Sequence, residues 1–179
     1  MSSLAIPVGR TDHSAGPGDA VVTLVEYGDY QCSYCGALHP VLKAVRSLMG
    51  DKLRFVFRNF PLIEIHPHAL AAAQLAEGAA EIGRFWTAHD LLFENQAALG
   101  EIDLFDFGER VGLDSSAVSR ALDGRFDERI RGDFLGGVRS GVNGTPCLFI
   151  NGSRYDGRNE LDALIDALGK AAVQSRRAS

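Results

Sequence analysis

The stretch VVTLVEYGDYQCSYCGALHP, residues 21–40, decides the fold class because it joins a strand pattern to a helical one. Residues 21–27 are β-branched and apolar apart from Glu26, which is typical of a largely buried strand. Cys32 and Cys35 then follow, separated by two residues. A cysteine pair at this spacing occurs in metal sites, structural disulfides and redox sites. The flanking segments have to decide between these three.

The segment after the cysteines predicts a helix. Apolar residues recur at helical spacing from Cys35 onward until Gly50, which is placed to end the helix. The two cysteines therefore lie at the first turn of this helix. Residues 53–61, LRFVFRNFP, predict a second strand that ends at Pro61. A strand, a helix and a strand of these lengths form a βαβ unit.

Residues 67–141 predict an almost continuous series of helices. The first is rich in alanine and is expected to end at Gly83. The second carries Trp86 and His89 on its apolar face, where we interpret them as packing residues. Asp114 is the expected N-cap of a later helix. This part of the chain predicts a helical block.

The strand pattern returns at residues 147–150, CLFI, and again at residues 153–157, SRYDG. Asn151 and Gly152 stand between them, a pair that favours the type I′ turn of a two-residue hairpin. A final amphipathic helix is expected to start at Asn159 as its cap.

The element order is therefore β-α-β, a helical block, then β-β-α, which predicts an α/β fold. Residues 1–62 and 141–169 are expected to form one unit, and residues 63–140 an inserted all-helical subdomain. Residues 170–179 are polar and are expected to be a disordered tail.

Composition excludes several classes of protein. The 179 residues are 46% apolar and 23% charged, with no long apolar run, as in an ordinary globular domain. The net charge of -5 argues against nucleic-acid binding. The N-terminal segment has no basic start followed by an apolar stretch, so we expect a cytoplasmic protein that is not membrane-bound. Three cysteines are too few for a disulfide scaffold, and a cytosolic CxxC pair is typical of catalysis or metal binding.

The arrangement resembles the thioredoxin fold with an inserted helical subdomain, as in the DsbA-like family of thiol-disulfide oxidoreductases. CSYC stands between a buried strand and a helix, Glu26 precedes it where thioredoxin-like proteins carry a buried acid, and Pro40 lies where their active-site helix kinks. Thr145 and Pro146 precede the hairpin, where the family places its cis-proline loop.

Other segments resemble the cytosolic-type branch of this family, among them FVFRNFPL, HPHALAAAQLAE, FWTAHDLLFENQ and GTPCLFING. The chain departs from DsbA in carrying Ser33 and Tyr34 between the cysteines instead of a Pro-His pair, and Cys147 after the proline. A neutral Tyr34 stabilises a neighbouring thiolate less than a histidine does. We therefore expect a redox potential between those of DsbA and thioredoxin.

The chemistry of disulfide exchange assigns a role to each site residue. Cys32 is the expected nucleophile, since it stands before a helix N-terminus. The helix dipole supplies about 0.3 to 1 kcal/mol, whereas lowering a thiol pKa from about 8.5 to 6.5 requires about 2.7 kcal/mol, so hydrogen bonds have to supply the rest. Cys35 is expected to resolve the mixed disulfide, and Glu26 to accept its proton.

The remaining site residues are expected to meet the substrate. A cis Pro146 would present the Thr145 backbone for strand-like pairing with a substrate chain. Ser33 and Tyr34 are expected to be exposed and to tune the site. The expected partners are proteins or small molecules with thiols or disulfides, and an electron partner that the sequence does not identify. No bound cofactor, no metal and no nucleic acid is expected.

Alternatives stay open for the same residues. Cys32 and Cys35 could form a zinc site completed by His39 and Cys147, or pack inertly. Glu26 could be a satisfied buried acid, and Cys147 is interpreted as a small buried apolar residue rather than a third redox thiol. At the level of function, the alternatives are a glutathione transferase of the kappa type, or a related isomerase, and a non-catalytic binding module of the same fold.

Overall fold

A computed structural model describes residues 2–178 of the chain. Its centre is a five-stranded sheet with the order β1-β3-β2-β4-β5. The central strands β2 (Val22–Gly28) and β3 (Leu53–Asn59) are parallel and are joined by α1 (Ser33–Met49) and a short 3-10 turn (Gly50–Lys52). The predicted βαβ unit is confirmed, and Gly50 ends α1 with φ 51°.

The predicted hairpin is also confirmed. Strands β4 (Cys147–Ile150) and β5 (Ser153–Tyr155) are antiparallel, and Ile150 pairs with Ser153 across the turn. Asn151 and Gly152 both have positive φ, 47° and 81°, as a type I′ turn requires. β4 pairs antiparallel with β2, so the hairpin continues the sheet beside the strand that leads to the cysteines.

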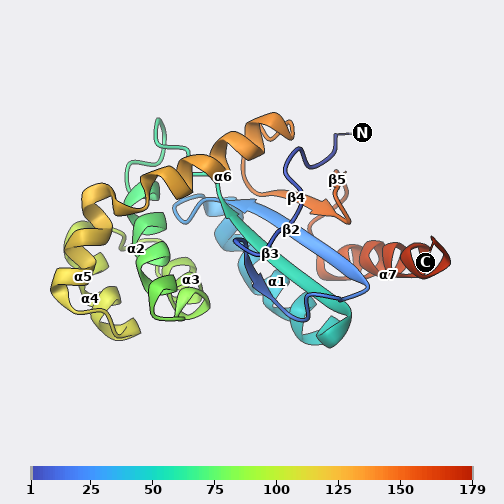
Figure 1. Ribbon diagram of the computed structural model, residues 1–179, viewed down its shortest axis with the longest axis horizontal. Coiled ribbons are helices and arrows are strands. Elements are labelled where there is room, and N and C mark those ends of the chain that lie inside the picture. Colours follow the sequence, from blue (N-terminus) through green and yellow to red (C-terminus); the bar gives the residue numbers. More distant parts are fainter. Residues whose placement is uncertain (1, 179) are drawn as a thin grey trace.

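Five α-helices lie between β3 and β4: α2 (Ala69–Glu81), α3 (Phe85–Glu94), α4 (Glu101–Val111), α5 (Ser115–Arg120) and α6 (Asp127–Arg139), with a π-helical turn at Ala121–Arg125. Gly83 follows α2 with φ 71°, and Asp114 caps α5 by accepting a hydrogen bond from the Ala117 N–H, both as predicted. Helices α2 to α5 form a block at one end of the molecule (Figure 1). The long helix α6 leads back from it over the sheet, where Phe134 stacks on Phe60.

The sheet separates two apolar cores. One contains Leu24, Phe55 and Phe57 together with both Cys32 and Cys35, and it continues into the helical block. The other contains Val25, Tyr27 and Phe149, with Phe134 of α6 packed against it. Successive residues of β2 therefore point to opposite cores, which explains why the strand lacks a polar face.

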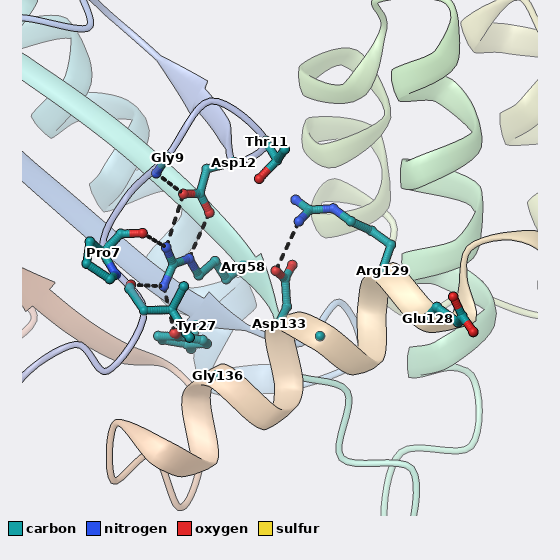
Figure 2. A pocket seen from close by; sticks show the side chains of 12 residues that line it. Pro7, Gly9, Thr11, Asp12, Tyr27, Arg58, Glu128, Arg129, Asp133 and Gly136 are labelled. Atoms are coloured by element: carbon teal, nitrogen blue, oxygen red, sulfur yellow. Dashed lines mark hydrogen bonds and ion pairs between the residues drawn. The ribbon is translucent and has the colours of Figure 1, made fainter.

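The fifth strand of the sheet, β1 (His13–Ala15), lies at its edge and was not predicted. A strand of three residues is too short to show a recognisable strand pattern in the sequence. β1 forms because a chain segment is held against β3: Arg58 of β3 donates hydrogen bonds to the Asp12 carboxylate and to the carbonyl oxygen of Ile6. A pocket of about 280 Å³ lies beside this anchor, between the N-terminal segment and α6 (Figure 2).

The C-terminal helix α7 (Leu161–Ala178) differs from the expectation in two ways. It begins at Leu161, so Asn159 is not its cap. It also continues through residues 170–178, where a disordered tail was expected; residue 179 lies outside the described part. Lys170 pairs with Asp166 one turn earlier, and Ala171 and Ala172 pack against the core, which extends the helix beyond its apolar stripe. Within residues 2–178, no helix is long and apolar enough to cross a membrane.

Candidate active site

The two cysteines lie where β2 passes into α1. Cys32 is the N-cap of α1, in extended conformation with φ -71° and ψ 119°, and Cys35 lies in the first turn. Cys32 is 4% exposed and Cys35 is fully buried. Among the residues that the structure describes, no side chain caps this helix, so the backbone N–H groups of its first turn are left to interact with the Cys32 sulfur.

The Cys32 thiol has a strongly lowered pKa, about 5. The largest cause is a hydrogen bond from the Cys35 thiol, which stabilises the Cys32 thiolate. Burial opposes the shift, while the Thr145 side chain and the backbone N–H groups of Cys35 and Tyr34 add to it. Cys32 is therefore ionised at neutral pH.

Two buried groups near Cys32, the Cys35 thiol and the Glu26 carboxyl group, have raised pKa values. Burial raises the pKa of Cys35 well above its usual range, and the hydrogen bond to Cys32 adds to this. Burial also raises the pKa of Glu26 to about 8, with a further contribution from the negative charge of Cys32. One ionised thiol thus lies next to a protonated thiol and a largely protonated carboxyl group, an arrangement that can accept and return one proton.

The loop before β4 completes the site from the other side. The Thr145–Pro146 peptide bond is cis. The Cys32 thiol, when protonated, donates a hydrogen bond of 3.4 Å to the Thr145 carbonyl oxygen. The buried Thr145 hydroxyl oxygen forms no conventional hydrogen bond with any other of the described residues. Both Thr145 and Pro146 are half-buried, whereas Ser33 and Tyr34 are exposed, Tyr34 to 75%.

Two residues that hold the cysteine loop were not among the site residues expected from the sequence. The buried Asp29 carboxylate accepts hydrogen bonds from the backbone N–H groups of Gln31 and Leu62. The Gln96 side chain, from the helical block, donates to the carbonyl oxygen of Cys32. Asp29 had a signal, since it directly follows a buried strand. Nothing in the local pattern marks Gln96.

Cys147 lies on the other side of the sheet from the cysteine pair. It pairs in register with Tyr27 and packs in the core that contains Val25 and Phe149. A zinc site made of Cys32, Cys35, His39 and Cys147 is therefore excluded, and Cys147 fills an apolar core. Burial raises the pKa of its thiol.

His39, His89 and Asp90 could hold a metal ion, since their ligand atoms lie within 4.8 Å of one another. The Asp90 carboxylate, however, already has the Lys43 ammonium group at 3.3 Å. The His39 ring is stacked on Phe93 inside the core. We therefore interpret this group as an ion pair at the border of an aromatic cluster and assign no metal to it.

Comparison with known proteins agrees with this geometry. A family model described as thioredoxin matches residues 9–170, so the chain belongs to the thioredoxin family. The fold matches that of oxidised BdbD from Bacillus subtilis with a TM-score of 0.84 and 20% identity, over 96% of this chain and 98% of that one. It also matches a thioredoxin-like oxidoreductase from Silicibacter pomeroyi, with a TM-score of 0.80 and 23% identity over 96% and 95% of the two chains.

A more similar sequence belongs to a much longer protein. The chain is 42% identical over 177 residues to a Na(+)/H(+) antiporter NhaA 1 of Salinispora arenicola, a match that covers 97% of this chain and 27% of that protein. The chain therefore spans about a quarter of the length of this relative. The antiporter name describes the whole relative, of which the region similar to this chain is one part.

Proposed function

We propose that the protein is a thiol-disulfide oxidoreductase that exchanges disulfides with protein or small-molecule thiols through Cys32 and Cys35. The observation that supports this most strongly is the contrast between the two thiols: the pKa of Cys32 is lowered to about 5, whereas that of Cys35 is raised. A thiolate attacks disulfides and a buried thiol resolves the product, so this pair has the properties that exchange requires.

In the reducing direction, the Cys32 thiolate attacks one sulfur of a substrate disulfide. A bond forms between Cys32 and that sulfur, and the other substrate sulfur leaves as a thiolate. Cys35 then transfers its proton to the ionised form of Glu26 and attacks the Cys32 sulfur. This releases the second substrate thiol and leaves a Cys32–Cys35 disulfide, so two electrons pass to the substrate.

The surface around Cys32 suits an extended substrate. The exposed side chains of Ser33 and Tyr34 flank the sulfur on one side, and the half-buried Thr145 and Pro146 lie on the other. In this proposal the Thr145 backbone pairs with the substrate chain by main-chain hydrogen bonds, which tolerate many sequences. An external dithiol or disulfide partner restores the starting state of Cys32 and Cys35.

A cytoplasmic location forms part of the proposal. Thiol reductants there would return the Cys32–Cys35 disulfide to the dithiol state. Alkylation of thiols in intact cells before lysis, followed by separation of the reduced and oxidised forms, would test it. A pair found fully oxidised in growing cells would argue for an oxidising compartment.

The function is tested with insulin reduction by dithiothreitol. Replacing Cys32 by serine removes the attacking sulfur and is expected to abolish catalysis. Replacing Cys35 by serine leaves the attack intact and is expected to accumulate mixed disulfides with substrate. Equal residual turnover in the two variants would contradict the proposal. So would a rate of iodoacetamide labelling of Cys32 that does not rise as the pH increases and the Cys32 thiol ionises. Either result would favour a binding module. The intact pair of Cys32 and Cys35 argues against a kappa-type transferase, since those enzymes lack an intact CxxC pair.

A further inference from the structure

Gln96, in the loop between α3 and α4, ties the helical block to the cysteine loop. Its side-chain nitrogen Nε2 donates hydrogen bonds to two backbone carbonyl oxygens, that of Tyr30 at 2.7 Å and that of Cys32 at 2.9 Å. Its oxygen Oε1 lies directly over Gly36, where the Cβ of any larger residue would overlap it. Gly36 thus makes room for the amide group.

The two hydrogen bonds restrain the carbonyl groups of Tyr30 and Cys32, the residues before and after Gln31, and so hold the backbone at the start of α1. The Cys32 carbonyl oxygen already accepts the first hydrogen bond of the helix, from the Gly36 N–H at 3.0 Å. A second donor on the same oxygen restrains the peptide plane that follows Cys32. The direction of the Cys32 side chain depends on this plane, because Cys32 is the N-cap and has no helical neighbour before it.

The direction of this side chain has a chemical consequence. The backbone N–H groups of Tyr34 and Cys35 stabilise the Cys32 thiolate. Hydrogen bonds weaken steeply when donor and acceptor are poorly aligned, so a small rotation of the Cys32 backbone would weaken several of them together. The loop has internal support from Asp29, whose carbonyl oxygen accepts from the Cys32 N–H at 3.1 Å. That contact holds the N–H side of Cys32, whereas its carbonyl oxygen is held by the Gly36 N–H and by Gln96.

We propose that Gln96 is a positioning residue for disulfide exchange: by holding the Tyr30 and Cys32 carbonyl groups, it aims the Cys32 sulfur at the first turn of α1. The inference rests on the proposed function for its effect on turnover. Gln96 touches no reacting atom and acts through the backbone of Cys32. In this way the helical block controls the reactivity of a cysteine that lies outside it.

The test is the pKa of Cys32, measured from the rate of iodoacetamide labelling against pH. Gln96→Ala removes the donor together with the side-chain bulk, and Gln96→Met keeps the length of the side chain but has no N–H group to donate and no charge. Both variants are expected to raise the pKa of Cys32 by about one unit, which at about pH 4 lowers the thiolate fraction about tenfold. A side chain that only filled space over Gly36 would be replaced by the uncharged Met without this shift.

Two further variants separate positioning from general damage. Asn95 lies in the same loop as Gln96 and donates a hydrogen bond of 2.7 Å to the Leu91 carbonyl oxygen of α3. Asn95→Ala removes this bond without touching the cysteine loop and is expected to keep the parent pKa of Cys32. Gly36→Ala displaces the Gln96 amide and is expected to reproduce the shift. Added to Gln96→Ala, it is expected to cause no further shift, since the amide is already gone.

The inference is overturned if folded Gln96→Ala and Gln96→Met keep the parent pKa of Cys32, or if Asn95→Ala shifts it equally. Should a Gln96 variant fail to fold, the pKa of Cys32 in Gly36→Ala decides in the same way. Failure of the proposed function has a different signature. It would appear as a parent protein that does not reduce insulin, while the labelling measurement and its comparison between variants remain possible.

Discussion

Replacing Glu26 by glutamine removes a buried acid while keeping the shape of its side chain. Glu26 is 1% exposed, and burial raises its pKa from 4.5 to about 8. At neutral pH the folded protein therefore holds a proton on this group that the unfolded chain releases. The pH dependence of folding is where this difference becomes measurable.

The sign and the size follow from the two pKa values. Because the folded state binds the proton more tightly, the contribution of Glu26 to stability is full below pH 4.5 and is lost as the pH rises through about 8. Each pH unit between the two pKa values corresponds to about 1.4 kcal/mol of free energy of unfolding. The loss is therefore about 3 kcal/mol by neutral pH and about 5 kcal/mol above pH 8, as an order of magnitude.

Urea unfolding from about pH 4.5 to pH 8 measures this loss. A background with Cys32→Ser and Cys35→Ser removes the titration of the thiols and leaves burial, the largest cause of the shift in Glu26, in place. In this background the stability of the parent is expected to fall with pH relative to that of Glu26→Gln, by about 3 kcal/mol at neutral pH. Glu64→Gln, at an exposed position, is the matched control and is expected to follow the parent. Parallel profiles of Glu26→Gln and the parent would refute the reasoning.

Three other predictions concern the far core, the N-terminal anchor and the redox potential. Cys147→Ala is expected to leave insulin reduction unchanged and to lower the free energy of unfolding by about 1 kcal/mol, since one small buried group is lost. Loss of most activity in the folded variant would contradict the position of Cys147 on the other side of the sheet from the cysteine pair. Asp12→Ala leaves the buried Arg58 guanidinium group without its carboxylate partner (Figure 2). It is expected to lower the free energy of unfolding, measured in urea, by about 3 to 5 kcal/mol. An unchanged urea midpoint would show that Arg58 does not need this partner. Equilibration with glutathione buffers is expected to give a redox potential of the Cys32–Cys35 pair between about -120 and -270 mV, because the exposed Tyr34 offers no positive charge to the Cys32 thiolate. A value as oxidising as about -120 mV would refute that argument.

The sequence by itself determined the features that depend on neighbouring residues. The apolar run before Glu26 defines a buried strand, and the helical spacing after Cys35 places both cysteines at a helix start. Asn151 and Gly152 define the hairpin through the positive φ that their turn needs. Each of these signals lies within a few residues of the structure it specifies, which is why it can be recognised in one chain.

Tertiary structure alone decided which distant groups meet. The carbonyl oxygen of Cys32 and the amide of Gln96 are 64 residues apart in the chain, and no local pattern encodes their contact. The same holds for β1, which exists because Arg58 anchors the segment that carries it. The position of Cys147 across the sheet from Cys32 follows from strand register, since a shift of one residue would turn its side chain to the other core. Register and long-range contact depend on how whole elements pack, and that packing set the electrostatics of the site.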